Sequence, residues 1–555
     1  MSTVLTILAA GAAVLLYALW WLFGNYFMRS PLDNIAGPTY KSVSAQFSTE
    51  IGRRQAWKFW ETLAKTYGPV TSMKGILGRR FLVIHDPKAL HTVMIKDQEI
   101  YVKGLAPLKH VHFFHVFDFT VLLGPGVLST IGAQHKRQRK QLNPVFSAAH
   151  LRNMTHIFYN VAHKVRNAIR ARVPAGGTGE VLDVNGWMAR TTLEMLGQAG
   201  LGYSFDSFVG DATDPYGESV KLFFPVSSRF QYFGLIIEKA SYILSASQIR
   251  GFLRRYPHKD VRHIMQISDT MRRRSQDIIE EKKAALRKGD EALLHQVGEG
   301  KDLMSICLKA NMTASEAEKL SDEELIAQMS TFILAGMDTT SNALSRILHL
   351  LAQNPTVQDK LRTEIVEARG GTGGETDTPY DDLIKLPYLD AVCRETLRLY
   401  APVTLSGRMA AKDSVIPLYT PIRGRDGNMI NEVIVTRGTL VLVHYQASNV
   451  DATLWGEDAY EWKPERWLSP PPAALEEARI PGVYSNLMTF AAGIRGCIGF
   501  KFSQLEMKVV LAVLLSSFSF ELTDKEITWN SSAVNYPTMG EDSTKPEMLL
   551  RVKAL

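Results

Sequence analysis

The chain has 555 residues, 46% hydrophobic and 21% charged, which describes a globular protein long enough for one large catalytic domain or several smaller ones. A net charge of +7 is too modest to indicate nucleic-acid binding and favours acidic partners or anionic lipid. Three scattered cysteines, Cys307, Cys393 and Cys497, argue against a disulfide framework and indicate a reducing compartment.

Residues 4–23 form an uncharged run of about the length that crosses a bilayer as a helix. A cleaved signal peptide is the competing interpretation, but no basic residue precedes the run and no convincing cleavage site follows it. Aromatic residues at its far end and basic residues beyond them place the remaining chain in the cytosol. These residues are Trp20, Trp21, Tyr26 and Phe27, then Arg29, Lys41, Arg53, Arg54 and Lys58. We therefore expect an uncleaved single-pass anchor at 1–24, in the endoplasmic reticulum membrane, and a linker at 25–54.

The remaining residues, 55–555, have the pattern of one domain with many helices and a small sheet. An amphipathic helix begins it, with Trp57, Trp60, Leu63, Ala64 and Tyr67 on one face. Two strands are predicted at 70–74 and 79–85, followed by a helix from Asp86-Pro87. Residues 151–310 are predicted to be mostly helical and to contain a movable cover, and further strands are expected at 433–443 and 548–552.

An aromatic and histidine-rich stretch lies between Tyr101 and Gly126. His112 and His115 could bind a metal, but no second ligand pair follows at a useful spacing, so a packed loop is favoured. In the next predicted helix, His135 and Arg139 are four residues apart and share one face. A solvated basic face explains the lysines and arginines around them.

A long helix is predicted from the capping box at Ser321–Glu324 to Gln353, where Asn354-Pro355 ends it. At ~1.5 Å per residue it spans roughly 48 Å and must cross the interior. Within it, Gly336 costs up to ~1 kcal/mol relative to alanine, which suggests close approach by something flat. Thr339 can hydrogen-bond the carbonyl of Ala335 and open a local groove, and Asp338 beside it can relay protons. A helix interface with a satisfied aspartate is the simpler alternative.

Glu395 and Arg398 are three residues apart on an otherwise apolar predicted helix, which suggests burial and a need for further partners. Arg466, in the run Trp462–Trp467, is a candidate partner. Such pairs are common on surfaces, so they are weak evidence alone.

A glycine-punctuated loop at 490–499, FAAGIRGCIG, delivers Cys497 to the start of an apolar helix predicted at 500–518. The dipole and the free N–H groups of the helix amino terminus favour a negative sulfur, so a thiolate is expected. Arg495 provides a cation suited to an acidic group on the edge of a ligand. A lone cysteine is more often a buried small hydrophobe. The full pattern F-x-x-G-x-R-x-C-x-G, however, closely resembles the haem-binding loop of the cytochrome P-450 monooxygenases, and the motifs above occur in that family's order. The basic helix and the Asp-Pro-led segment look most like the fungal, microsomal (class II) branch.

The resemblance implies a mainly α fold with a subsidiary β region, holding haem b between the long helix and the Cys497 loop. Cys497 would be the iron ligand, a thiolate that favours O–O cleavage, and Phe490 would pack near it. Arg139, Arg408 and Arg495 would hold the haem propionates with His135, which replaces the family's tryptophan. Glu395, Arg398 and Arg466 would form a structural lock behind the loop. Asp338 and Thr339 would manage proton delivery.

The same resemblance implies hydroxylation or related oxidation of an apolar substrate. The pocket would be lined by Phe113, Phe114, Phe332, Ala335, Val403 and Leu405. Such a lining suits a terpenoid or sterol-like molecule, although aromatic or fatty substrates also fit it.

No flavin or nicotinamide domain is visible, so electrons would come from a separate NADPH-cytochrome P-450 reductase, with cytochrome b5 as a second possible donor. A basic face at Arg139, Lys140, Lys501 and Lys508 would bind it. Two alternatives stay open: a haem-thiolate isomerase or dehydratase, which tends to lack the acid-alcohol pair, and a non-catalytic membrane haem protein that binds an apolar ligand.

Overall fold

The computed structural model describes most of the chain. The described residues are 28–39, 54–75, 78, 80–103, 119–174, 176–209, 215–227, 240, 243–288, 297, 300–370 and 376–555, with isolated positions between 5 and 24. Within this part of the chain, no helix combines the length and the apolar composition that a membrane span requires. The anchor expected at 1–24 falls largely outside the described residues.

Helices make up the larger part of the fold. The α-helices are α3 (Trp57–Tyr67), α4 (Pro87–His91), α5 (Phe119–Leu123), α6 (Gly132–Leu142), α7 (Ala148–Arg170), α8 (Val184–Met195), α9 (Pro215–Lys221), α10 (Phe223–Ser227), α12 (Ala246–Arg255), α13 (Lys259–Lys288), α15 (Leu303–Thr313), α16 (Asp322–Gln353), α17 (Pro355–Ala368), α18 (Tyr380–Lys385), α19 (Pro387–Leu399), α20 (Tyr445–Asn449), α21 (Ala452–Trp455), α22 (Ala473–Ala478) and α23 (Phe500–Leu515). Short 3-10 and π segments are η1 (Pro31–Asn34), η4 (Thr92–Lys96), η5 (Asn143–Phe146), η6 (Leu196–Leu201), η8 (Pro464–Leu468), η9 (Met488–Phe490) and η10 (Gly493–Arg495).

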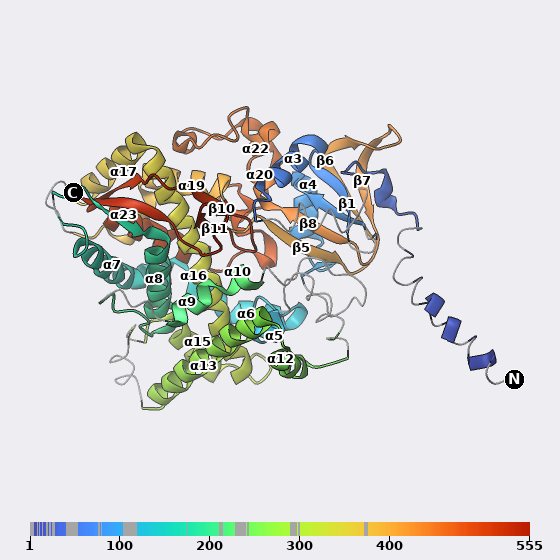
Figure 1. Ribbon diagram of the computed structural model, residues 1–555, viewed down its shortest axis with the longest axis horizontal. Coiled ribbons are helices and arrows are strands. Elements are labelled where there is room, and N and C mark those ends of the chain that lie inside the picture. The colour runs from blue at the N-terminus through green and yellow to red at the C-terminus, as the bar shows by residue number, and fades with distance from the viewer. Residues whose placement is uncertain are drawn as a thin grey trace.

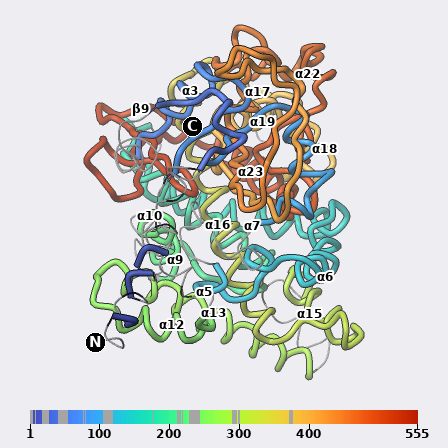
Figure 2. Tube along the Cα trace, turned by 90° about the vertical axis from the view of Figure 1, so that its right-hand side faces the viewer, coloured from blue at the N-terminus to red at the C-terminus, as the bar shows by residue number. Residues whose placement is uncertain are grey.

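Helix α16 is the centre of the helical part, and Figures 1 and 2 both show it crossing the middle of the molecule. The predicted capping box is confirmed: the Ser321 hydroxyl accepts from Glu324 N at 3.2 Å, and the Glu324 carboxylate accepts from Ser321 N at 2.9 Å. The helix packs against α8, α13 and α23, and nearly its whole length is buried. It therefore provides a rigid wall through the core.

The strands form four small sheets. They are β1 (Val70–Lys74), β2 (Arg80–Ile84), β3 (Tyr101–Val102), β4 (Glu180–Asp183), β5 (Leu405–Ala410), β6 (Ser414–Arg423), β7 (Met429–Val435), β8 (Leu440–His444), β9 (Phe518–Leu522), β10 (Ile527–Asn530), β11 (Tyr536–Met539) and β12 (Leu549–Ala554). The largest sheet has the order β1-β2-β8-β5-β3 and lies to one side of the helices (Figure 1). It brings together segments more than 300 residues apart, because β2 pairs in parallel with β8.

Two sequence-based boundaries need correction. The helix after Cys497 ends at Leu515 rather than Phe518, because the chain turns at Ser516 and starts β9 at Phe518. The strand β4 lies in a stretch predicted to be mostly helical, and it pairs with β12 near the carboxyl end. Its pairing partner is more than 350 residues away, so no local pattern could indicate it.

Candidate active site

The Cys497 loop is shaped by backbone hydrogen bonds. Cys497 N donates to Phe490 O at 2.8 Å and Gly496 N donates to Gly493 O at 2.9 Å. Gly493 has φ +65°, and a Cβ there would lie 2.0 Å from Met94 O, so no other residue fits this turn. The loop thus holds Cys497 directly before the first turn of α23.

The Cys497 thiol is exposed, although it lies deep enough that burial raises its pKa. The Gly499 N–H and the charge of Arg139 act in the opposite direction, but burial is the larger effect. The helix end and Arg139 therefore favour the thiolate, while burial opposes it. A metal ion bound at the sulfur would supply the missing positive charge. Cys307 and Cys393 are buried, as predicted.

Several basic side chains gather beside the loop. Lys103, His135, Arg139, Arg408 and Arg495 are here called the basic cluster. Arg139 Nη1 donates to Gly496 O at 2.8 Å, and Arg495 Nη2 donates to Thr130 O at 2.7 Å. The two arginines therefore fasten the loop to α6 and to the segment before it.

The members of the basic cluster repel one another. Burial and then Arg408 and Arg139 lower the pKa of Arg495 to about 10. Burial, followed by Arg495, Arg139 and Lys103, lowers the pKa of His135 to about 3, which leaves its ring neutral with an N–H to donate. None of the described carboxylates contributes to either shift. A group of buried and half-buried cations of this kind fits the acidic edge of a ligand, as two propionates would supply.

Lys103 was missed by the sequence reasoning. Antiparallel pairing of β3 with β5 matches Tyr101 with Ala410 and Val102 with Met409, so Lys103 comes next to Arg408. Burial, then Arg408 and Arg495, lower the pKa of Lys103 to about 7. The only sequence signal is a lysine directly after a two-residue strand, which does not reveal the pairing.

Three residues in the buried central part of α16 are partly exposed. Ala335, Gly336 and Thr339 are partly exposed, whereas every other residue from Ala327 to Ser345 is buried. Thr339 Oγ1 donates to Ala335 O at 2.7 Å, which confirms the predicted bond. The predicted approach of a flat ligand to Gly336 stays a prediction, and the structure adds a second reason for the glycine, because a Cβ there would lie 3.0 Å from the Leu196 side chain of η6. The glycine thus allows close packing of a neighbouring segment.

Asp338 is buried, with 4% of its surface exposed. Burial raises its pKa to about 7, against the lowering effects of Lys221 and of a hydrogen bond from Asn342. A carboxyl group with this pKa can both donate and accept a proton near neutral pH. Asp338 and Thr339 are adjacent in the helix, so the predicted acid-alcohol pair has suitable acid-base chemistry.

The predicted charge lock, Glu395, Arg398 and Arg466, is present and fully internal. Arg398 pairs with Glu395 at 2.8 Å with both side chains 0% exposed, and Arg466 Nε lies 3.4 Å from the same carboxylate. Trp467 Nε1 donates to Glu395 Oε2 at 2.9 Å, a partner that sequence reasoning missed. The carboxylate is therefore shared by three side chains.

Asn449 connects the charge lock to the Cys497 loop and was also missed. Arg398 Nη1 donates to Asn449 O at 3.1 Å, and Asn449 Nδ2 donates to Thr489 Oγ1 at 2.8 Å. Thr489 directly precedes Phe490, and its hydroxyl donates to Leu397 O at 2.8 Å. The lock thus supports the loop through neutral side chains.

The predicted pocket residues have different outcomes. Phe113 and Phe114 lie outside the described residues, as do His112 and His115. Phe332 is buried and packs edge-to-face on Phe146, with ring centroids 5.5 Å apart, so it belongs to the aromatic core. Val403 and Leu405 are half-buried before and at the start of β5. The described residues contain no group of three or more His, Cys, Asp or Glu side chains that could hold a metal ion.

Comparison with known proteins now decides the family. The family model described as Cytochrome P450 matches residues 43–538. The chain belongs to the cytochrome P450 family. A ganoderic acid synthetase from Ganoderma lucidum is 57% identical to this P450 over 100% of the chain and 99% of the relative. Cytochrome P450 monooxygenases 91 and 81 from Postia placenta are 49% and 48% identical, over 97% and 98% of the chain and 98% and 96% of the relatives.

This P450 is accordingly a monooxygenase of the fungal type, with a haem-iron cofactor, a redox partner and an apolar substrate. The described residues fit the cofactor in three ways. The Cys497 sulfur is accessible to an iron ion, the basic cluster has no described carboxylate to neutralise it, and α16 has a partly exposed face at Ala335, Gly336 and Thr339. The residues that would hold it are Cys497, Arg139, Arg408 and Arg495, with His135 and Lys103.

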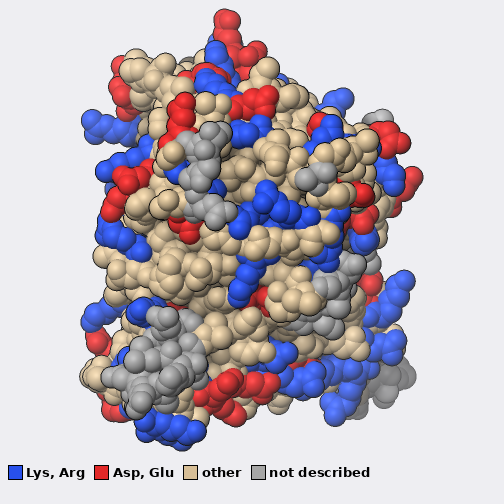
Figure 3. All heavy atoms as spheres, turned by 90° about the vertical axis from the view of Figure 1, so that its left-hand side faces the viewer, with Lys and Arg blue, Asp and Glu red and all other residues tan. Residues whose placement is uncertain are grey.

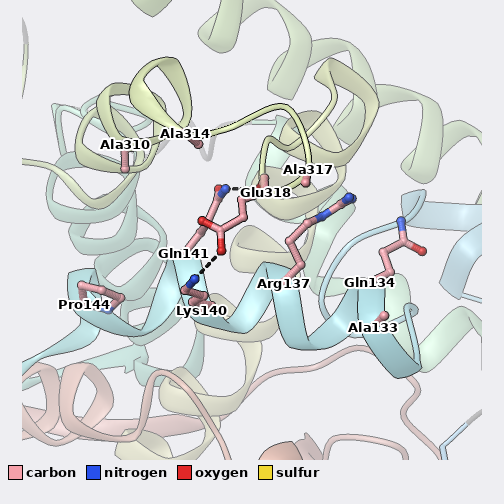
Figure 4. A pocket seen from close by; sticks show the side chains of 10 residues that line it. All are labelled: Ala133, Gln134, Arg137, Lys140, Gln141, Pro144, Ala310, Ala314, Ala317 and Glu318. Atoms are coloured by element: carbon pink, nitrogen blue, oxygen red, sulfur yellow. Dashed lines mark hydrogen bonds and ion pairs between the residues drawn. The ribbon is translucent and has the colours of Figure 1, made fainter.

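A separate groove of about 590 Å³ lies on the other side of α6 (Figure 4). Arg137, Lys140 and Gln141 of α6 line it opposite the alanines of the α15–α16 connection, and Lys140 pairs with Glu318 across it. None of the basic-cluster residues lines this groove. It is therefore not the haem site.

Proposed function

We propose that this P450 inserts one atom of dioxygen into an apolar organic substrate, using electrons from a separate NADPH-dependent reductase. The observation that carries the proposal is the combination of Cys497 with the acid-alcohol pair on α16. Haem b bound at Cys497 would supply the redox chemistry that activates dioxygen. An isomerase or dehydratase would have no use for the pair.

The roles of the protein groups follow from their contacts. The basic cluster would bind the propionates and orient the cofactor, and the charge lock would keep the Cys497 loop in place behind it. The bond from Thr339 to Ala335 O fixes the hydroxyl so that its lone pairs can accept a proton. Asp338, with a pKa of about 7, would donate a proton to the Thr339 hydroxyl after Thr339 has given one up.

The substrate is proposed to be a terpenoid or sterol-like secondary metabolite. Support comes from the relative that is named for ganoderic acid synthesis and from Ala335, an apolar residue on the partly exposed face of α16. Apolar walls favour a rigid hydrocarbon body because its burial is favourable and costs little conformational entropy.

The proposed location is the cytosolic face of the endoplasmic reticulum membrane, with residues 1–24 as a single-pass anchor. NADPH-cytochrome P-450 reductase, with cytochrome b5 as a second donor, would bind the basic face near the Cys497 loop. Of the residues predicted for that face, Lys140 is exposed and Lys501 half-buried. Lys508 is excluded, because it is 1% exposed and pairs with Asp390 at 2.7 Å.

On one face of the molecule, charges of both signs are present, so no large surface of a single sign directs a partner there. On the face shown in Figure 3, basic and acidic side chains are interspersed. The net charge of +7 is therefore not gathered on that side.

The test uses microsomes that contain the full chain and a reductase, a panel of apolar metabolites, and oxygen-18. We expect one labelled oxygen atom in the product and substrate-dependent NADPH consumption. Cys497→Ala should lose the thiolate-type carbon monoxide spectrum and all product formation. Product without the label would favour an isomerase or dehydratase. A bound apolar ligand with no NADPH consumption for any metabolite would favour a binding protein.

A further inference from the structure

Two buried asparagines form a chain of hydrogen bonds from α8 to Asp338. Asn342 Nδ2 donates to Asp338 Oδ1 at 3.2 Å and to Asp338 O at 2.8 Å. Asn185 Nδ2, from α8, donates to Asn342 Oδ1 at 3.1 Å. Asn185 is 0% exposed and Asn342 3% exposed. The Asp338 carboxyl is thus tied through two amides to a neighbouring helix.

The arrangement fixes which way each amide points. Asn342 uses its amide N–H groups on Asp338, so its carbonyl needs a donor, and Asn185 Nδ2 supplies one. Asn185 Nδ2 also donates to Ser345 Oγ at 3.1 Å, whereas Asn185 Oδ1 has no partner among the described residues. Leaving a buried acceptor unpaired costs about 1–3 kcal/mol. Asn185 is held by its two Nδ2 hydrogen bonds, to Asn342 and to Ser345.

The charges near Asp338 are few. Lys221 of α9 is the charged group that acts on Asp338. The charged residues of α8 nearby are engaged elsewhere, since Arg190 pairs with Asp206 at 2.5 Å and Glu194 accepts from Ser204 at 2.6 Å. The contacts that α8 makes with α16 here are therefore made by uncharged groups.

We propose that Asn185 and Asn342 are positioning residues that tie Asp338 Oδ1 to the amide chain and so fix the orientation of the Asp338 carboxyl. This rests on the proton-relay role proposed above for Asp338. The hydrogen bond from Asn342 stabilises the ionised carboxyl, and Asn185 in turn keeps Asn342 in the donating orientation. The proton affinity of Asp338 therefore depends on a residue of another helix.

The α8 helix supplies a matched control. Thr192 lies seven residues after Asn185, is also buried, and donates to the α16 carbonyl of Met337 at 3.0 Å. Thr192→Val removes a hydrogen bond between the same two helices without touching the amide chain. A purely structural role of Asn185 would make Asn185→Leu and Thr192→Val equivalent.

The experiment follows the infrared band of the protonated Asp338 carboxyl against pH in the purified full-length holoprotein, with Asp338→Asn to assign the band. Asn342→Leu should raise the midpoint by about one pH unit, because the carboxylate loses a hydrogen bond. Asn185→Leu should raise it by less, and Thr192→Val should leave it unchanged. Asn342→Ser keeps a hydrogen-bond donor, so its titration midpoint should lie between those of Asn342→Leu and the parent protein. If the leucine variants do not fold, Asn185→Ala and Asn342→Ser provide the same ranking.

An unchanged midpoint in the Asn342 variants, or equal shifts in the Asn185 and Thr192 variants, would overturn the proposal. The infrared titration requires no turnover, so it can fail while the enzyme still oxygenates its substrate, and it can succeed where no product forms. In an enzyme that turns over, the inflection of the product-formation rate against pH should move in the same order as the infrared midpoint.

Discussion

Two groups of charged side chains support the Cys497 loop, the charge lock through Asn449 and Thr489 and the basic cluster through Arg139, and they differ in whether their charges are paired. In the charge lock, the Glu395 carboxylate contacts Arg398, Arg466 and Trp467. The other N–H groups of the two arginines donate to backbone carbonyls. In the basic cluster, the charged members are all cations, His135 is neutral, and no described carboxylate contributes to the shifts in pKa. Both groups required the same costly desolvation of arginine.

The difference separates structural charge from binding charge. A buried pair that is internally complete holds backbone segments together, whereas buried cations without an acid are arranged for something the protein must bind. The haem-free protein should therefore be destabilised by loss of a lock residue, whereas loss of Arg408, which does not fasten the loop to another segment, should relieve repulsion in the cluster.

The largest effect is expected for Glu395→Ala, which leaves Arg398 as an uncompensated buried charge, whereas Arg466 keeps its pair with Asp458 at 2.8 Å. The free energy of unfolding should fall by about 3–5 kcal/mol, measured by urea denaturation of the full-length protein. Haem should be lost at the same time, because Asn449 and Thr489 no longer hold the loop. The exposed pair Lys65–Glu61 is the control, and Glu61→Ala should cost less than about 0.5 kcal/mol. If both variants lost the same free energy of unfolding, the charge lock would be no more important for stability than an exposed ion pair.

For Arg408→Leu we expect weaker haem binding without a loss of stability of the haem-free protein. Haem affinity should fall roughly tenfold to a hundredfold, because a charge-assisted hydrogen bond to a propionate is lost. The urea midpoint of the haem-free protein should stay level or rise, since one of several repelling cations is gone. A haem-free protein destabilised as strongly as Glu395→Ala would show that Arg408 is structural.

The third effect is a dependence of stability on pH through Lys103, measured as a slope per pH unit. Its folded pKa of about 7 lies below the ordinary value of 10.5, so between these pH values the unfolded chain binds a proton there that the folded chain does not. The unfolding free energy of the haem-free protein should therefore rise with pH through this window, by up to about 1.4 kcal/mol per pH unit. Lys103→Met should remove that slope, as should Lys103→Arg, which stays charged. Identical slopes in parent and variants would contradict the placement of Lys103 beside Arg408.

The local features of the site were readable from the sequence. The capping box predicted α16, the i to i+4 spacing predicted the Thr339–Ala335 bond, and Glu395 with Arg398 predicted a buried pair. Each depends on residues within a few positions of one another, where helix geometry fixes the contact. The Cys497 motif likewise lies within ten residues.

Features that join distant segments were not readable. Lys103 meets Arg408 only because β3 pairs with β5, and Asn185 reaches Asn342 only because α8 packs on α16. Lys508 appeared to be a surface cation, although Asp390 of another helix holds it in the interior.

The sequence by itself therefore determined the family, the long central helix, the iron ligand to be tested and the acid-alcohol pair, because these depend on local spacing. Tertiary structure decided the rest: which charges are paired, that Leu196 packs close to Gly336, and that burial raises the pKa values of Cys497 and Asp338. Desolvation is the physical reason. It depends on everything that surrounds a group, and no local pattern records which residues those are.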